Sequence, residues 1–174
     1  MIICISGYTG AGKDAIGMRL SKALNIRHVN RSYKEFVKDH MDVIKFSEEA
    51  DAKFSKNFDG EVIKAAHAGS CVVTTWLGPW VIKDADIRVW LHASIEERAR
   101  RKAKDLGMST SEAISYIKKR DVSTVGMAKR AYGSSMLEDR SAFDVEINTE
   151  KVMLEEAVSM LSLLAVSKSG SAPK

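Results

Sequence analysis

The sequence is poor in cysteine and proline, with two of each among 174 residues, and it has no apolar run long enough to span a membrane. Cys4 and Cys71 both fall in predicted buried strands, which indicates small core residues in a reducing compartment and excludes a disulfide framework or a metal pair. No signal peptide precedes the first predicted strand. We therefore expect a cytoplasmic protein with no membrane partner.

A large excess of charge of one sign is also absent. The sequence has 27 lysines and arginines against 23 aspartates and glutamates, which gives a formal charge of +4. This mild, scattered excess suits an anionic small molecule as the partner and argues against nucleic acid. The length fits one domain with a real core, and 45% apolar and 29% charged residues are ordinary for a globular chain.

The pattern around which the rest of the sequence is organised lies at its start. The apolar, β-branched residues 2–6 predict a buried strand, and residues 14–24, with Ile16, Leu20 and Leu24 on one face, predict a helix. Between them stands Gly-x-x-x-x-Gly-Lys, the spacing of a phosphate-binding loop. The alternative is a glycine-rich turn that binds nothing, but the position between a strand and a helix favours the loop.

The residue types of this loop are those that phosphate binding requires. Glycines let the backbone approach a phosphate closely, and successive N–H groups with the helix dipole supply partial positive charge. Lys13 adds a mobile charge for the β- and γ-phosphates. The predicted ATP-binding residues are Gly7, Tyr8, Thr9, Gly10, Ala11, Gly12, Lys13, Asp14 and Ala15.

Asp14 stands where the loop usually has a serine or threonine whose hydroxyl binds Mg²⁺. A carboxylate is also a hard oxygen ligand, and negative charge is favourable at a helix start. We therefore predict that Asp14 binds the metal, directly or through water, with simple capping of the helix as the equal alternative.

Strands alternate with helices along the rest of the chain. The predicted strands are residues 2–6, 26–29, 70–74, 86–91 and 143–147. The predicted helices are residues 14–24, 32–40, 41–50, 51–67 (with a loop around 57–60), 94–106, 109–131 and 150–166, and a disordered tail follows at 167–174. This alternation predicts a single α/β domain, residues 1–166, in which helices cover both faces of a parallel sheet and the ligand lies at the carboxyl ends of the strands.

The most basic segment falls in the predicted helix 94–106. Arg98, Arg101 and Lys102 share one flank of that helix, and Arg120 lies in the middle of the next one. A solvated helix surface is the usual explanation of such a run. Beside a phosphate-binding loop, however, arginines are suited to neutralising a phosphoryl group in transfer, which favours a catalytic role for at least one of them.

A family resemblance extends over the chain up to about residue 164. The motifs that carry it are, in order, Met1-Ile2-Ile3 leading into the loop, residues 24–29 (Leu-Asn-Ile-Arg-His-Val), residues 85–91 (Ala-Asp-Ile-Arg-Val-Trp-Leu), Glu97-Arg98-Ala99 with Arg101, residues 129–133 (Lys-Arg-Ala-Tyr-Gly), and Phe143-Asp144 with residues 147–149 (Ile-Asn-Thr). In these motifs the sequence resembles the archaeal-type cytidylate kinases, which belong to the nucleoside-monophosphate kinases and to the P-loop NTPase fold.

The resemblance implies a three-layer fold with five parallel strands in the order 2-3-1-4-5, a monophosphate-binding insert near 30–67 and a helical lid near 94–133. The implied reaction is ATP + (d)CMP to ADP + (d)CDP with Mg²⁺, catalysed by a cytoplasmic monomer. Lys13 would hold the transferring phosphate, and Arg98, Arg101 and Arg120 would be lid arginines. Asp59 falls near a family acid that touches the base.

The sequence departs from the family at the arginines that bind the acceptor. Val37 follows Phe36 where the family has an arginine, so that only Arg31, Lys34 or Lys38 could replace it. The family's Glu-Gly-Arg after the third strand reads Thr-Trp-Leu at residues 75–77, and two more family arginines are Asp105 and Met127 here. Each lost arginine would cost about 2–5 kcal/mol of binding unless another group replaces it.

Three hypotheses remain open at this point. The first is a cytidylate kinase in which other residues replace the missing arginines. The second is a kinase of the same fold for another acceptor, such as another nucleotide, dephospho-coenzyme A or a phosphorylated metabolite, with Trp76 facing the acceptor. The third is a nucleotide-binding module without catalysis. Basic side chains that converge opposite the loop would favour the first, a deep apolar pocket beneath Trp76 and Trp80 the second, and a closed cavity the third.

Overall fold

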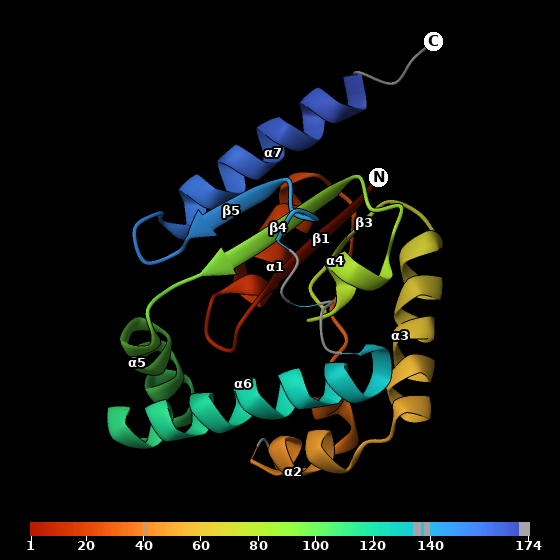
Figure 1. Ribbon diagram of the computed structural model, residues 1–174. Helices are drawn as coiled ribbons and strands as arrows, with labels where there is room; N and C mark the ends of the chain where they lie inside the picture. Colours follow the sequence, from red (N-terminus) through yellow and green to blue (C-terminus); the bar gives the residue numbers. More distant parts are fainter. Residues whose placement is uncertain (40, 134–136, 138–139, 171–174) are drawn as a thin grey trace.

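The computed structural model describes residues 1–39, 41–133, 137 and 140–170, and its centre is a sheet of parallel strands (Figure 1). The strands are β1 (Ile2–Gly7), β2 (Arg27–Val29), β3 (Cys71–Val73), β4 (Ile87–His92) and β5 (Val145–Asn148). Their spatial order is β2-β3-β1-β4-β5 and all four pairings are parallel. The sheet predicted from the sequence, with its order 2-3-1-4-5, is therefore confirmed.

Strand β1 lies at the centre because both of its faces can be buried. All six of its residues are buried, and alternate side chains point to opposite faces of the sheet. Ile2 and Cys4 belong to one apolar cluster, and Ile3 and Ile5 belong to the other. The two clusters are the two halves of the core.

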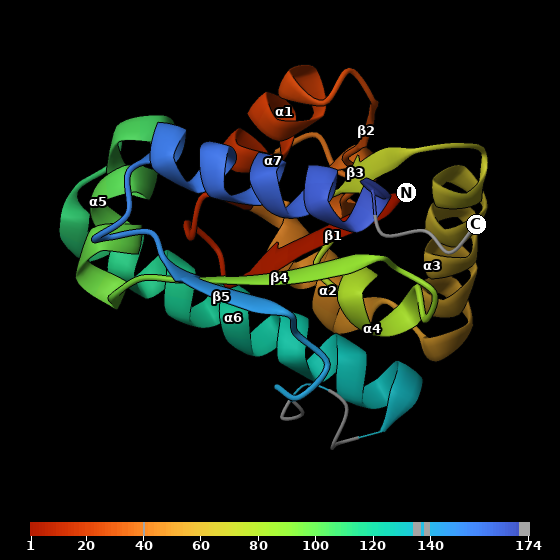
Figure 2. The ribbon, with the colours of Figure 1, turned by 90° about the horizontal axis from the view of Figure 1, so that it is seen from above.

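Helices cover each half of this core (Figure 2). Helices α1 (Lys13–Ala23) and α7 (Leu154–Gly170) pack on the Ile3 and Ile5 face through residues such as Leu20 and Leu161. On the other face lie α3 (Ala52–His67), α4 (Gly78–Val81) and α6 (Thr110–Tyr132), with η1 (Tyr33–Phe36) and α2 (Asp42–Glu49) beyond them. Helix α5 (Ile95–Leu106) packs on α6 at one end of the sheet. In the described part of the chain, no helix has the length and apolarity needed to cross a bilayer.

The segment between β2 and α3 differs from the prediction. Residues 32–40 were expected to be helical, but in the described part, 32–39, only the short 3₁₀ turn η1 forms, and residue 40 lies outside the described residues. The ring of Tyr33 lies edge-on to Phe46, Phe54 and Phe58 at centroid distances of 5.6, 5.5 and 4.9 Å. This aromatic cluster determines the path of the segment, because tertiary packing outweighs local helix propensity.

Two further differences concern helix ends and a predicted loop. Helix α3 runs without a break through residues 57–60, where a loop was expected around Gly60. Helix α7 begins at Leu154 and continues to Gly170, so that part of the segment predicted as a disordered tail is helical. Residues 171–174 of that segment lie outside the described residues.

Leu161 and Leu163, near the middle of α7, provide a test of this packing. Leu161 is 1% exposed in the core, whereas Leu163 is 73% exposed on the same helix. We expect Leu161→Ala to lower the free energy of unfolding by about 2–5 kcal/mol, because it leaves a cavity. Leu163→Ala, the matched control, should change it by less than about 0.5 kcal/mol. Urea unfolding of both variants measures the difference, and equal losses would contradict the placement of α7.

Candidate active site

The phosphate-binding loop is wedged between β4 and α5, and two of its glycines allow this close approach. A Cβ atom at Gly7, where φ is +157°, would lie 2.5 Å from the carbonyl oxygen of Leu91. A Cβ atom at Gly10, where φ is +84°, would lie 2.8 Å from the carbonyl oxygen of Arg98. No side chain fits at either distance, so Gly7 and Gly10 are required by packing as well as by the backbone conformation.

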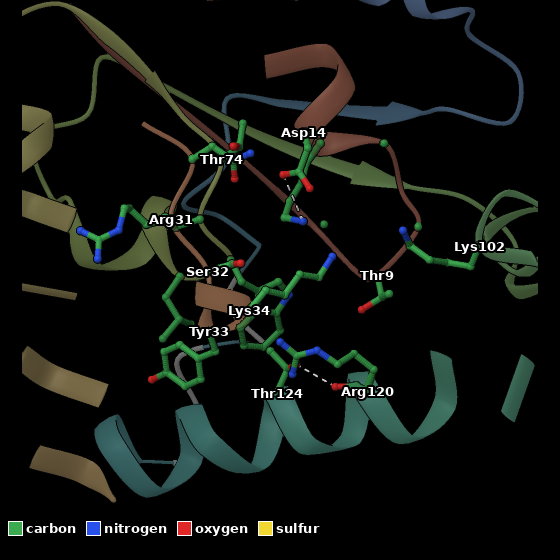
Figure 3. A pocket seen from close by; sticks show the side chains of 18 of the residues that line it. Thr9, Asp14, Arg31, Ser32, Tyr33, Lys34, Thr74, Lys102, Arg120 and Thr124 are labelled. Carbon is green, nitrogen blue, oxygen red and sulfur yellow. Dashed lines mark hydrogen bonds and ion pairs between the residues drawn. The ribbon is translucent and has the colours of Figure 1, made fainter. Parts of the chain in front are cut away.

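A cavity of about 420 Å³ opens in front of the loop, within the usual size range of small-ligand sites. Its walls come from the loop and the start of α1, from the ends of β2 and β3, and from α3, α5 and α6 (Figure 3). The predicted site residues that line it are Gly7, Thr9, Gly10, Gly12, Lys13, Asp14, Ala15, Arg31, Lys34, Asp59, Trp76, Arg101 and Arg120. The described residues Tyr8, Ala11 and Arg98 were predicted as well but do not line the cavity.

Cationic side chains reach this cavity from opposite walls. Lys34 comes from η1, Arg120 from α6 and Lys102 from α5 (Figure 3). Lys13, at the end of the loop, also lines the cavity. Although the Lys34 side chain is open to the solvent of the cavity, enclosure by the walls lowers its pKa, and the charges of Lys102 and Lys13 lower it further. Mutually repelling cations in one cavity make a site for a multiply charged anion.

Arg120 lies in this cavity surrounded by neutral partners. Its Nη1 donates to the hydroxyl groups of Ser47, Ser123 and Thr124 at 3.0, 3.3 and 2.8 Å. Burial lowers its pKa, and none of the described carboxylates forms an ion pair with it. An arginine held in this way keeps its full charge available for a phosphate.

Arg98, predicted as a lid arginine, takes another position. It is buried, and its Nη1 forms an ion pair with Asp121 Oδ2 at 2.7 Å and donates to the carbonyl oxygen of Thr9 at 3.1 Å. Helix periodicity places Arg98 on a flank with Arg101, but it cannot reveal an acid on α6 that turns the guanidinium away from the cavity.

Arg101 lies at the rim of the cavity and is largely engaged with the backbone. It donates to the carbonyl oxygens of Gly10 and Thr149 at 3.3 and 2.6 Å and to the Thr149 hydroxyl at 3.0 Å. Glu97 accepts from its Nε at 2.9 Å, and hydrogen bonds from Arg100 and Arg101 lower the pKa of Glu97 to about 2. Arg101 thus holds the loop against the turn that follows β5.

Asp14 is the acid nearest to the loop lysine. Its Oδ1 lies 3.4 Å from the Nζ of Lys13, and half of its side chain is exposed in the cavity. Among the described residues, no group of three or more metal-ligating side chains occurs. A single half-exposed carboxylate suits Mg²⁺, which is commonly bound by one or two carboxylates together with substrate phosphates.

Asp59 lies at the other end of the cavity, on α3. The hydroxyl of Tyr132 donates to its Oδ2 at 2.6 Å. Burial raises the pKa of Asp59 to about 6, although the hydrogen bond from Tyr132 opposes this shift. No hydrogen bond to its Oδ1 is found among the described residues, and this oxygen can accept from a ligand that offers a hydrogen-bond donor.

Arg31 and Trp76, the last two residues predicted to bind the acceptor, have different surroundings. Arg31 pairs with Glu35 at 2.7 Å and lies over the ring of Phe58, 5.6 Å from its centroid, so that it points away from the other cations (Figure 3). Trp76 lines the cavity with part of its ring and packs on Tyr8 and Trp80. Because its ring is held by these contacts, Trp76 shapes the cavity wall.

Several site residues were not predicted. They are Lys102, Asp121, Thr124 and Tyr132. A sequence signal existed for Lys102, which shares the basic flank of α5, and for Tyr132, which belongs to a family motif. Asp121 and Thr124 carried no signal, because their roles depend on the way α6 crosses in front of the loop.

The parallel sheet and the glycine loop at the end of β1 define the P-loop NTPase fold. Among solved structures, a deoxyadenosine kinase from M. mycoides with bound dATP superposes on 95% of this chain and 100% of its own, with a TM-score of 0.58 and 17% identity.

Curated relatives name the family. Residues 31–151 match the cytidylate kinase-like family. The sequence is 34% identical to the cytidylate kinase of Sulfurisphaera tokodaii over 90% of both chains. It is 30% identical to that of Pyrococcus horikoshii over 87% of this chain and 81% of the relative. The chain belongs to the cytidylate kinase-like family and is a phosphotransferase with a phosphate group as acceptor.

The pKa of Asp59 leads to a test by pH. Its pKa is 3.8 in the unfolded chain and about 6 when folded, so the folded state retains a proton that the unfolded state loses in that window. This group therefore makes the free energy of unfolding fall as pH rises from 3.8 to about 6. Asp59→Asn lacks this titrating group. Across this pH range we therefore expect the free energy of unfolding of the unmodified protein to fall relative to that of the variant, by on the order of 1–3 kcal/mol.

Urea unfolding at a series of pH values measures this contribution. Tyr132→Phe is the companion variant: it removes the hydrogen bond that lowers the pKa of Asp59, and so it should extend the fall to higher pH. Identical pH profiles for Asp59→Asn and the unmodified protein would contradict the buried, protonated carboxyl.

Proposed function

We propose that the protein transfers the γ-phosphoryl group of ATP to CMP or dCMP, giving ADP and CDP or dCDP, with Mg²⁺ as cofactor. The observation that carries this proposal is the convergence of Lys13, Lys34, Lys102 and Arg120 on one cavity beside the phosphate-binding loop. Two nucleotides meeting through their phosphates supply the concentrated negative charge that such a cavity requires. Relatives named cytidylate kinase support the choice of acceptor.

The loop side of the cavity is the proposed ATP site. Backbone N–H groups at the start of α1 would bind the phosphates, and Lys13 would contact the transferring group. In this scheme Asp14 and the phosphate oxygens would hold Mg²⁺, which screens the charge between the two nucleotides. Arg120, on the facing wall, would stabilise the charge that spreads over the phosphoryl group as its bond to ADP breaks and its bond to the acceptor oxygen forms.

The acceptor is assigned to the side formed by η1 and α3. Lys34 is the proposed replacement for the arginine that the sequence lacks beside Phe36, because its ammonium group lies among the other cations of the cavity. Asp59 would accept a hydrogen bond from the exocyclic amine of cytosine through Oδ1, while Tyr132 fixes Oδ2. Arg31 lies near this end, at the ring of Phe58.

A second candidate acts on another phosphorylated acceptor. The observation that favours it is Trp76, whose ring forms part of the cavity wall and would suit a bulkier apolar group. A module without catalysis has less support, because the cavity is open and no described carboxylate forms an ion pair with Arg120 on its wall. We further propose a cytoplasmic monomer that acts on nucleotides and does not bind nucleic acid.

The direct test is release of ADP from Mg-ATP, with CMP, dCMP, UMP, AMP, dTMP and dephospho-coenzyme A as separate acceptors. We expect the highest kcat/KM with CMP or dCMP. Turnover with only one of the other acceptors would move the protein to the second candidate. ATP binding without turnover on any acceptor would contradict the proposed function.

The role of Lys34 has its own test. We expect Lys34→Gln to raise the KM for the acceptor about tenfold or more and to leave the KM for ATP within about twofold, because a charged contact to phosphate is lost. Since burial and neighbouring cations lower the pKa of Lys34, the acceptor KM of the unmodified protein should also rise at alkaline pH, as this group loses its proton.

Lys38→Gln is the matched control. Lys38 is exposed, does not line the cavity, and was the other lysine that the sequence offered for this role. Its substitution should leave both KM values unchanged. Equal effects of the two substitutions would contradict the assignment of Lys34.

A further inference from the structure

The backbone of Thr9, in the middle of the phosphate-binding loop, is held on both sides by distant side chains. Its N–H donates to Asp121 Oδ1 at 3.2 Å, across 112 residues of sequence. Its carbonyl oxygen accepts from Arg98 Nη1 at 3.1 Å, across 89 residues. Arg98 and Asp121 also bind each other at 2.7 Å, and their side chains are only 10% and 17% exposed. Together they close a clamp around the backbone of one loop residue, with one contact to each of the two peptide units that flank the Thr9 Cα.

The clamp links the loop to the helix that carries the facing arginine. Asp121 directly follows Arg120 in α6, but the two side chains have different surroundings: Arg120 lines the cavity, whereas Asp121 does not. Thr9 is likewise four residues before Lys13 in the loop. Because Asp121 contacts Thr9 directly, the loop and α6 cannot shift separately without breaking this hydrogen bond.

The surroundings of the clamp leave it little freedom. The ring of Tyr8 lies 5.6 Å from the guanidinium carbon of Arg98 on one side. On the other, the backbone of Arg98 lies so close to Gly10 that a Cβ there would be 2.8 Å from the Arg98 carbonyl oxygen. Helix α5, the loop and α6 therefore meet at a single tightly packed point.

We infer that Asp121 is a positioning residue that fixes the separation between the two halves of the phosphate-binding cavity, with Arg98 as its partner in the clamp. This inference rests on the proposed phosphoryl transfer, in which Lys13 and Arg120 must contact one phosphoryl group from opposite sides. It also gives Arg98 a different role from that of a lid arginine on the phosphates. The competing explanation is that Asp121 only neutralises the buried charge of Arg98.

Two substitutions at position 121 separate these explanations. Asp121→Ala removes both contacts, whereas Asp121→Asn removes the charge and retains an oxygen that can accept from the Thr9 N–H. With saturating Mg-ATP and CMP, we expect Asp121→Ala to lower kcat about tenfold or more, because a small misplacement of catalytic groups is costly. The KM for CMP should stay within about twofold, since Lys34 and Asp59 are untouched. Asp121→Asn should recover most of the lost kcat.

A second measurement does not depend on turnover. In ¹⁵N-labelled protein, exchange of the Thr9 amide hydrogen should be about tenfold faster in Asp121→Ala than in the unmodified protein, because the amide loses its acceptor, and close to the unmodified rate in Asp121→Asn. If the unmodified protein turns over none of the acceptors while the amide responds as expected, the proposed function fails and the clamp stands. If the amide does not respond, the clamp itself is contradicted.

Glu155→Ala is the matched control. Glu155 forms an ion pair with Arg19 of the same length, 2.7 Å, but on the exposed surface between α1 and α7. It should leave kcat and the Thr9 amide unchanged. Equal kcat losses for Asp121→Asn and Asp121→Ala would mean that only the charge matters, and a loss confined to the KM for CMP would place Asp121 in the acceptor site. Either result would overturn the inference.

Discussion

The structure depends on the close packing of the phosphate-binding loop against its neighbours. At Gly7 and Gly10 the loop approaches the carbonyl oxygens of Leu91 and Arg98 so closely that neither position has room for a Cβ atom. This contact fixes β4 and α5 relative to β1. Helix α6 packs on α5, and this contact places α6 across the front of the loop. The cavity is the space that this arrangement leaves between the loop, α6 and the aromatic segment after β2.

The charge distribution follows from that geometry. The cavity gathers cations from the loop, η1, α5 and α6, and the hydroxyl groups around Arg120 stabilise its position without neutralising it. Enclosure by the cavity walls lowers the pKa of Lys34, and the neighbouring charges of Lys102 and Lys13 lower it further. A multiply charged anion bound among these cations would offset their mutual repulsion.

Features that depend on local sequence patterns could be predicted from the sequence. The strand, the loop and the helix stripe around residues 2–24 predicted the centre of the fold, and the alternation of strands and helices with the family motifs predicted the order of the sheet. What the sequence could not show depends on contacts between distant segments. Helix periodicity grouped Arg98 with the arginines predicted to be catalytic, but Asp121 holds it behind the loop. The aromatic packing around Tyr33 replaced a predicted helix by a single turn. Lys34 was one of three possible substitutes in the sequence. In the structure both Lys34 and Arg31 line the cavity, but Arg31 forms an ion pair with Glu35, a contact that the sequence did not reveal.

In the proposed reaction, one cavity holds two nucleotides end to end through their phosphates. The most direct measurement is the affinity of a bisubstrate compound, adenosine and cytidine joined through five phosphates, determined by calorimetry beside ATP and CMP alone. The account predicts that the joined compound binds at least about a hundredfold more tightly than ATP, because one ligand then fills both halves of the cavity. Binding no tighter than that of ATP would show that the cytidine half finds no site, and it would contradict the account.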